Sequence, residues 1–462
     1  MRQPPLAVAG ARQRLLIEST LLMFPRAKIL TSNRVGLAVT LALLAVLVAH
    51  ARTAFPRQLG IDFYHFWGIP LVQRLAVTSP DPYRAPRAYA AVLNKIADTS
   101  SSQKLHEANR YRRLIEPTAT PFLYAIFAFL PDDYPRAQAL FALIQYLAAG
   151  CAIYLLARLR EVGRWPAIWI ALLTELTFNP FVQDVKVGNV NSLQLVFIAV
   201  LLAVAVRKRY SGNAVVDGLF IGLLGVFVLF KPNTPWIALA LAGHYWVVRG
   251  SRSFFVGVGV AAMLGTLPLL IGAWYFKHAS VWLAWLHYAR GIGRGALHYS
   301  FDQGNQSLPM LLAGNNGSYG TAGYGLLIAM TLLVCLLLTF TSNGRAGNDL
   351  AHRARDAFSN PWFAASIGVL FTFATSPLVW PHYHLLALIP IVWLAGGGGR
   401  GHLGTLAAVV CYCALSRPLL NVLLTYECYT ALRITMLCSW VPLLPSVFAY
   451  GARQTQGSPA AG

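Results

Sequence analysis

The sequence predicts an all-α polytopic membrane protein with about 12 transmembrane helices, and three observations carry this prediction. Of the 462 residues, 56% are hydrophobic and only 11% are charged, and the mean hydropathy is +0.54. Soluble globular proteins do not have this composition. Apolar runs of roughly 17–22 residues recur almost from end to end, which is the length that crosses a bilayer as a helix. Basic residues fall in short clusters between these runs, as the positive-inside rule describes.

The net positive charge and its placement indicate which molecules the protein binds. A formal net charge of +21 would suit a nucleic-acid-binding protein, but the short topogenic clusters argue against that class and in favour of membrane lipids as surroundings. The six cysteines lie in or beside apolar runs, and none pairs with histidine at zinc spacing. The sequence therefore predicts no nucleic acid, no metal, no cofactor and no disulfide framework.

The arginine clusters predict an orientation with both ends of the chain in the cytoplasm. Residues 1–34 are basic and form a first tail, and residues 451–462 form a second. A cleaved signal peptide is the alternative for the N-terminus, but the basic stretch is long for a signal's charged region. One membrane domain covers 35–450. Its predicted spans are 35–51, 137–157, 165–179, 191–206, 215–230, 234–248, 254–276, 324–341, 362–375, 383–395, 403–416 and 434–450.

One apolar run does not fit the pattern of crossing helices. The run over 121–130 has only about ten residues between prolines, which is too short to span a bilayer. We expect a re-entrant or interfacial half-helix there. This interpretation places an arginine cluster on every inner loop, whereas a crossing helix would turn most clusters outward. The long segments 52–136 and 277–320 then lie outside, on the extracytoplasmic face of what we expect to be a bacterial inner membrane.

Asp62 is the most informative residue, because it lies among aromatic residues just after the first predicted span. Acidic residues are scarce in this chain (16, against 37 basic), and a carboxylate at a membrane edge is costly to keep there. A partly desolvated carboxylate could accept a proton from a sugar hydroxyl as a general base. The alternative is a residue that caps a loop helix. His65, in the same aromatic cluster, is a candidate for sugar or acceptor binding.

Three further candidates, Lys231, Asn189 and Asn191, lie at the ends of predicted spans. Lys231 comes before Pro232 at the outer end of a span, where an amine could hold a lipid phosphate as a point charge; the alternative is a lysine that snorkels to the interface. Asn189 and Asn191 open the span over 191–206. They could bind a polar head group, or they could cap that helix.

The remaining candidates lie in the second outer loop and in a proline-broken turn. Asn305 and Gln306 carry amides, which suit sugar hydroxyls because they donate and accept in one plane; a simple polar turn is the alternative. Trp380 could stack on a sugar, and His382 could donate to a phosphate, since a break of this kind lets side chains meet a ligand at membrane depth. An aromatic belt at the interface is the other reading of Trp380.

Taken in order along the chain, these residues resemble glycosyltransferase family 87, the polyprenol-phosphate-mannose-dependent α-mannosyltransferases of the GT-C class. The resemblance covers about residues 60 to 390. The matching stretches are Asp62-Phe63 with Asp81-Pro82-Tyr83, Pro121-Phe122-Leu123, Gly188-Asn189-Val190-Asn191, Lys231-Pro232, Asn305-Gln306-Ser307-Leu308, and Ser376-Pro377 through Trp380 and His382.

The resemblance implies a GT-C-like fold and a metal-independent, inverting sugar transfer at the extracytoplasmic face. Asp62 would deprotonate the hydroxyl of a glycolipid or glycan acceptor, and Lys231 and His382 would neutralise the departing polyprenyl phosphate. Mannose is the implied donor sugar. Two departures from the family pattern leave that sugar open: Asn189 replaces the usual glutamine of Gly-Gln-x-Asn, and Pro381 lies just before His382.

Two other function classes compete with a glycosyltransferase. A polytopic transporter or lipid flippase would also suit 12 spans, but it should show internal repeats with polar breaks at mid-depth. The sequence shows no such repeat, and its polar groups gather on one predicted face. A non-catalytic membrane scaffold would leave that gathering unexplained.

Overall fold

The computed structural model describes residues 33–55, 58–75, 81–207, 214–293, 299, 304–313, 319–340, 350–396, 402–425, 428–447 and 449. This part of the chain is helical, and its extended backbone pairs at one isolated bridge, between Phe178 and Ser416. The helices are α3 (Asn33–Ala54), α4 (Ile61–Leu75), α5 (Pro86–Thr99), α6 (Gln103–Tyr111), α7 (Pro121–Phe127), α8 (Tyr134–Leu159), α9 (Arg164–Thr177), α10 (Asn179–Val187), α11 (Asn191–Arg207), α12 (Ala214–Phe230), α13 (Pro235–Tyr275), α14 (Val281–Gly293), α15 (Leu308–Ala313), α16 (Tyr319–Phe340), α17 (Leu350–Phe358), α18 (Pro361–Thr375), η3 (Pro381–Ala387), α19 (Leu388–Ala395), α20 (His402–Ala414), α21 (Arg417–Thr425) and α22 (Tyr429–Cys438).

Three of the described helices are long and apolar enough to cross a membrane: α3, α8 and α13. A fourth span is possible if α17 and α18, which meet at an angle of 100°, count as one broken helix. Most other predicted spans correspond to apolar helices of 10–17 residues. The structure thus confirms that the described residues form a helical protein with three helices long and apolar enough to span a membrane, while the number of twelve spans stays a prediction.

The helix α13 corresponds to two predicted spans joined end to end. Its 41 residues are interrupted at Gly250, whose φ of 76° is non-helical. Glycine takes this conformation without the steric cost that other residues bear. The interruption falls between the predicted spans 234–248 and 254–276. Helices α12 and α18 both pack against α13, and the three belong to the main bundle.

The predicted helix over 434–450 is wrong in its continuity. Helix α22 ends at Cys438, and turns follow over 439–442 before a short helical stretch over 443–447. Pro442 lacks a backbone N–H and its ring clashes with a preceding carbonyl, so an uninterrupted helix is disfavoured there. The predicted tails, residues 1–34 and 451–462, lie outside the described residues except for 33 and 34.

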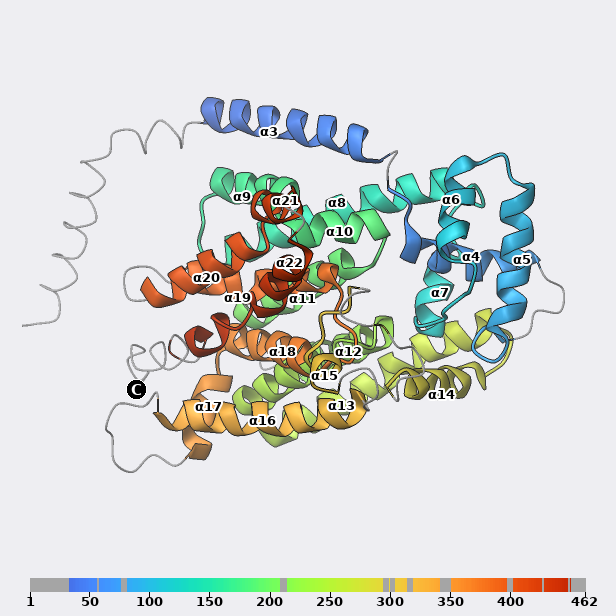
Figure 1. Cartoon of the computed structure of the whole chain (residues 1–462). Helices are drawn as coiled ribbons and strands as arrows, with labels where there is room; N and C mark the ends of the chain where they lie inside the picture. The colour runs from blue at the N-terminus through green and yellow to red at the C-terminus, as the bar shows by residue number, and fades with distance from the viewer. Residues whose placement is uncertain are drawn as a thin grey trace, which may run out of the picture.

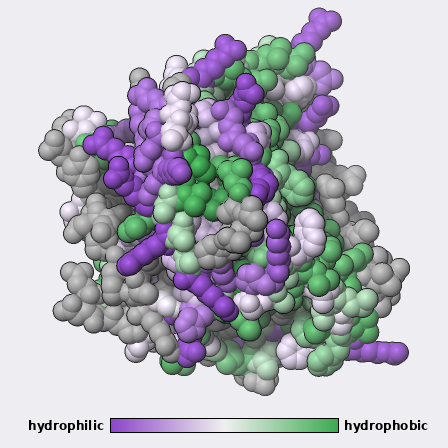
Figure 2. Space-filling model, turned by 90° about the vertical axis from the view of Figure 1, so that its right-hand side faces the viewer, coloured by the Kyte–Doolittle hydropathy of each residue, from purple (hydrophilic) through white to green (hydrophobic). Residues whose placement is uncertain are grey.

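The first long predicted loop is itself a folded helical unit. Helices α4, α5, α6 and α7 gather at one end of the molecule, with α14 beside them (Figure 1). We call residues 61–75, 81–127 and 281–293 the end lobe. Its aromatic core is separate from that of the bundle and includes Phe63, Trp67, Tyr89 and Trp285. Many hydrophilic side chains cover this end of the molecule (Figure 2).

Helix α7 has the short length that the sequence predicts for its segment. Its seven residues begin after Thr120, whose hydroxyl accepts from the Leu123 N–H as an N-cap. Most of its side chains are buried, and it contacts α4, α12, α13 and α14. Seven helical residues cannot cross a bilayer, and their re-entrant placement stays a prediction.

The end lobe is fixed to the bundle where α4 begins. The Gly60 N–H donates to the Lys186 carbonyl at 3.1 Å, and the Tyr134 hydroxyl donates to the Leu59 carbonyl at 2.6 Å. Gly188 ends α10 with a φ of 69°, and a Cβ there would lie 2.5 Å from the Cβ of Phe63, which is fully buried. Only glycine at 188 allows α4 and the α10–α11 turn to approach this closely.

Replacing Gly188 with alanine should therefore separate α4 from the α10–α11 turn. We expect Gly188→Ala to destabilise the protein by about 2 to 4 kcal/mol, from the left-handed conformation and the overlap with Phe63. Unfolding in mixed detergent micelles measures this. The matched control is Gly225→Ala in α12, where a Cβ meets nothing within 4 Å; equal stability of the two variants would contradict the close approach.

Candidate active site

A cavity of about 290 Å³ lies between the end lobe and the bundle. Residues from distant parts of the sequence meet there, from α4, the segment after α6, the α10–α11 turn, the end of α12 and the turn before η3. The polar and aromatic residues that line it are Asp62, His65, Phe66, Arg112, Glu116, Thr118, Asn189, Lys231, Asn233, Tyr299, Ser376, Trp380 and Tyr383.

Asp62 lies in the first turn of α4, where the helix dipole favours a carboxylate. Its side chain is 20% exposed and turns toward the cavity rather than toward its own helix. Oδ1 accepts from the Arg112 guanidinium at 3.1 Å, and Oδ2 accepts from the Asn189 amide at 2.8 Å. Both oxygens are thus occupied by partners from other segments, which a simple capping role would not produce.

The surroundings of Asp62 favour its charged form. Burial alone would raise the pKa of this carboxyl, but His382, Arg112, the Asn189 hydrogen bond and His65 outweigh that effect, so the pKa lies below its ordinary value. Burial lowers the pKa of His382 to about 3, so the positive charge that faces Asp62 at neutral pH is that of Arg112. His382 Nε2 lies 3.8 Å from Asp62 Oδ2 and has no hydrogen-bond partner among the described residues. Asp62 is therefore an unprotonated carboxylate at neutral pH.

His65 lies near Asp62 and lines the same cavity. Burial and the nearby Arg112 lower its pKa to about 3, so its imidazole is neutral at neutral pH. Its Nε2 is buried without a hydrogen-bond partner in the described part of the chain. A neutral imidazole with a free nitrogen can accept from, or donate to, a ligand hydroxyl.

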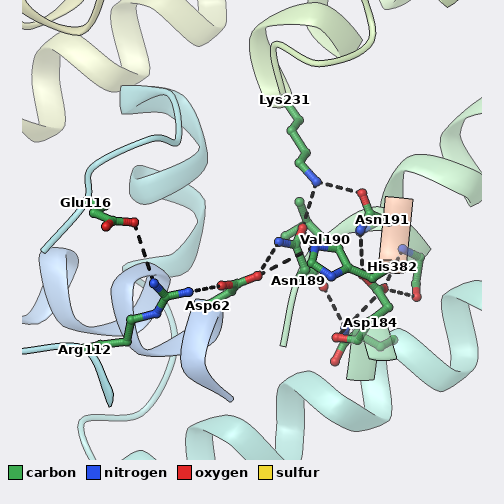
Figure 3. A network of polar contacts seen from close by, with 11 residues as sticks. Asp62, Arg112, Glu116, Asp184, Asn189, Val190, Asn191, Lys231 and His382 are labelled. Atoms are coloured by element: carbon green, nitrogen blue, oxygen red, sulfur yellow. Dashed lines mark hydrogen bonds and ion pairs between the residues drawn. The ribbon is translucent and has the colours of Figure 1, made fainter. Parts of the chain in front are cut away.

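Lys231 follows the last residue of α12 and extends toward the two asparagines of the α10–α11 turn (Figure 3). Its Nζ donates to Asn189 Oδ1 at 2.8 Å and to Asn191 Oδ1 at 2.7 Å, and it lies 4.5 Å from the ring centre of Tyr383. The side chain is 8% exposed. Burial lowers the pKa of Lys231, and the negative charges of Asp184 and Asp62 oppose that effect.

Each asparagine amide joins Lys231 to a carboxylate. Asn189 accepts from Lys231 and donates to Asp62 Oδ2, while Asn191 accepts from Lys231 and donates to Asp184 Oδ1 at 2.8 Å. No direct ion pair joins Lys231 to an acidic residue among the described side chains. The lysine thus sits between two carboxylates and is separated from each by one amide (Figure 3).

Arg112 connects Asp62 to a second acidic residue of the end lobe. It lies just after α6 and bridges Asp62 to Glu116, 3.6 Å away on its other side. The Tyr299 hydroxyl faces the charges of Arg112 and Glu116 and has no hydrogen-bond partner among the described residues, and its ring meets Trp380 edge-on at 5.2 Å between centres. Aromatic faces next to a carboxylate and a guanidinium make a surface suited to a polar, ring-shaped ligand.

Asn305 and Gln306 lie behind the cavity rather than on its wall. The Asn305 amide donates to the Pro377 carbonyl and accepts from the Val379 N–H, both at 3.1 Å. The Gln306 Oε1 accepts from the His384 Nε2–H at 3.1 Å. The turn that carries Trp380 and His382 is anchored by these contacts. A direct contact of either amide with a sugar stays a prediction.

The structure brings most of the predicted site residues together. Asp62, His65, Asn189, Lys231 and Trp380 line the cavity. The other predicted residues support it from behind: Asn191, which bonds Lys231; His382, buried beside Asp62; and Asn305 and Gln306, in the anchoring contacts.

Sequence reasoning missed Arg112, Glu116 and Tyr299. Arg112 lies in the run Arg110-Tyr111-Arg112-Arg113, where nothing in the sequence separates it from its neighbours. Tyr383 was also not singled out, although it follows His382. Asp184 did carry a signal, because it is an acidic residue between two predicted spans in a chain with few acids. Among the described residues, no three His, Cys, Asp or Glu side chains are placed to hold a metal ion.

Comparison with known proteins assigns the chain to a family. Residues 116–377, more than half of the chain, match glycosyltransferase family 87. The matched region contains Asn189, Asn191, Lys231, Asn305 and Gln306, and it ends just before Trp380 and His382. Asp62 and Arg112 lie before it. No curated protein and no solved structure matches the chain.

The matched segment supplies the wall of the cavity around Lys231, and the apolar helices agree with the family's membrane setting. The chain belongs to glycosyltransferase family 87 and is a membrane glycosyltransferase.

Proposed function

We propose that this protein transfers a sugar, with mannose as the first candidate, from a polyprenyl-phosphate donor to a hydroxyl of a glycolipid or glycan acceptor. The reaction inverts the anomeric carbon and takes place on the extracytoplasmic face of the bacterial inner membrane. One observation carries the proposal: a carboxylate and a buried ammonium, Asp62 and Lys231, line one cavity and are held apart by Asn189.

Asp62 supplies the base in this proposal. Its charged form is stabilised, so it is ready to accept the proton of an acceptor hydroxyl as that oxygen attacks the anomeric carbon. Each carboxylate oxygen has two lone pairs, so the bonds from Arg112 and Asn189 still leave room for the acceptor proton. His65 and the Trp380 ring line the space in which the acceptor and the transferred sugar would lie.

Lys231 supplies the charge for the leaving group. An ammonium has three donors, and two of them are used by Asn189 and Asn191. The third is available to an oxygen of the lipid phosphate as negative charge grows on it. His382 Nε2 lies 3.8 Å from Asp62 Oδ2 without a hydrogen-bond partner among the described residues, and it supplies a further donor in this proposal.

The donor class is tested with purified protein and a set of polyprenyl-phosphate sugars, with radiolabel followed into a glycolipid fraction. We expect transfer from polyprenyl-phosphate mannose and none from nucleotide sugars. Transfer from a nucleotide sugar alone would contradict the proposed donor.

Asp62→Asn should abolish transfer while leaving donor binding intact. The amide keeps the shape of the carboxylate but cannot accept the proton, so we expect the rate to fall by at least about a hundredfold. Radiolabel transfer measures the rate, and equilibrium binding of the donor serves as the check on folding. Asp98→Asn, at an exposed position of α5, is the control. Turnover near normal in Asp62→Asn would remove Asp62 from the role of base.

Arg112→Gln should shift the acid side of the pH–rate profile. Arg112 lowers the pKa of Asp62, so its removal raises that pKa and the carboxylate becomes protonated at higher pH. Activity in the variant should therefore be lost at a higher pH than in the unmodified protein, while the alkaline side stays in place. Arg110→Gln, at an exposed position of α6, is the matched control. An unchanged acid limb would show that Arg112 does not act on the base.

A further inference from the structure

Asp184 is a fully buried carboxylate that does not line the cavity. It lies in α10, between two apolar helices. Its oxygens receive five hydrogen bonds: from the Gln145 amide, from the N–H and side-chain amide of Asn191, and from the N–H and hydroxyl of Ser192. Burial raises the pKa of the Asp184 carboxyl to about 6, while the Ser192 hydroxyl, Lys231 and the Asn191 amide oppose that effect, so Asp184 is charged at neutral pH. Two of the five hydrogen-bond donors are the first backbone N–H groups of α11, so Asp184 also caps that helix.

We propose that Asp184 is the positioning residue of Lys231: acting through Asn191, it supplies the negative charge that keeps the buried ammonium protonated and in place. The proposal rests on the proposed function, in which Lys231 meets the donor phosphate. Asp184 touches neither the cavity nor, in this account, any substrate.

Asp184 fixes the orientation of the Asn191 side-chain amide. Its Nδ2 donates to Asp184 Oδ1 at 2.8 Å, and its Oδ1 therefore faces Lys231 Nζ at 2.7 Å. The carboxylate of Asp184 can only accept, so it selects the NH₂ of Asn191 and leaves the amide oxygen for the lysine. An inverted amide would place donors against donors.

The Asn191 amide keeps the charges of Asp184 and Lys231 apart. A carboxylate in direct contact with Lys231 would neutralise it and compete with a phosphate for the same N–H groups. A carboxylate one amide away still stabilises the ammonium through space, yet leaves its third N–H open to the cavity. The other charged or titratable groups that face Lys231 are Asp62 from α4 and His382 and Tyr383 from η3.

The test replaces the charge and follows the titration of Lys231. In Asp184→Asn, the lysine loses a stabilising anion and should deprotonate at a pH lower by at least about one unit. Labelling of the protein with a small amine-reactive reagent at a series of pH values, with the Lys231 peptide quantified by mass spectrometry, measures this directly. It needs no substrate, so it tests Asp184 even if the proposed donor is wrong. An unchanged titration would overturn the proposal.

Transfer kinetics give a second, independent readout. In Asp184→Asn, the KM for the polyprenyl-phosphate donor should rise about tenfold at pH 8 and return toward the normal value at pH 6, where Lys231 is protonated again. A role in helix capping alone would give the same defect at both pH values, and that result would contradict the proposal. Absence of transfer by the unmodified protein would refute the proposed donor and leave the labelling result to decide on Asp184.

Two further variants complete the design. Asp184→Glu keeps the charge and should restore the titration at least in part. If Asp184→Asn does not fold, Asn191→Ala removes the intervening amide and should produce the same downward shift; a normal titration there would overturn the proposal.

Discussion

The amide of Asn189 is the contact on which the site depends. Two groups of opposite charge, Asp62 and Lys231, face the same cavity at the boundary between the end lobe and the bundle. If they met directly, they would neutralise each other and leave neither a base nor a cation for a substrate. The amide accepts from the ammonium at 2.8 Å and donates to the carboxylate at 2.8 Å. It satisfies both while keeping them apart.

The rest of the local fold places that amide. The left-handed turn at Gly188 lets the α10–α11 turn lie against Phe63 of α4, which brings Asp62 within reach of Asn189. Asp184 fixes the start of α11 and the neighbouring amide of Asn191. On the opposite side, Asn305 anchors the turn that presents Trp380. The α10–α11 turn and the turn that carries Trp380 are therefore both supported by buried hydrogen bonds to residues that do not line the cavity.

The sequence predicts the class of fold and the composition of the site better than its geometry. Apolar runs and arginine placement predict helices and membrane spans, because both depend on local chemistry. The predicted boundary between the spans 234–248 and 254–276 likewise agrees with the interruption of α13 at Gly250. The helical content of the first long loop was not predicted: α5 and α6 are polar and amphipathic, so they resemble surface loop segments when hydropathy alone is read.

Some residues of the site can be identified from the sequence, and others only from the structure. Asp62, Lys231 and Asn189 stand out because charged and amide groups are costly near a membrane and need a reason to be there. Arg112 and Tyr299 do not stand out, since they lie in polar segments where their residue types are ordinary. Arg112 gains its partner Asp62 only when the segment after α6 packs beside α4 within the end lobe, and Tyr299 gains its contact with Trp380 only in the folded chain. The supporting role of Asn305 likewise depends on a turn 72 residues away, which no local pattern reveals.

The most direct test of the account is a structure of the protein with a non-hydrolysable polyprenyl-phosphate sugar bound. The account predicts a phosphate oxygen within hydrogen-bond distance of Lys231 Nζ, about 3 Å, with the anomeric carbon on the side of the cavity that Asp62 faces. A phosphate bound away from Lys231, or a sugar that Asp62 cannot approach, would contradict the assignment of this cavity as the site of transfer.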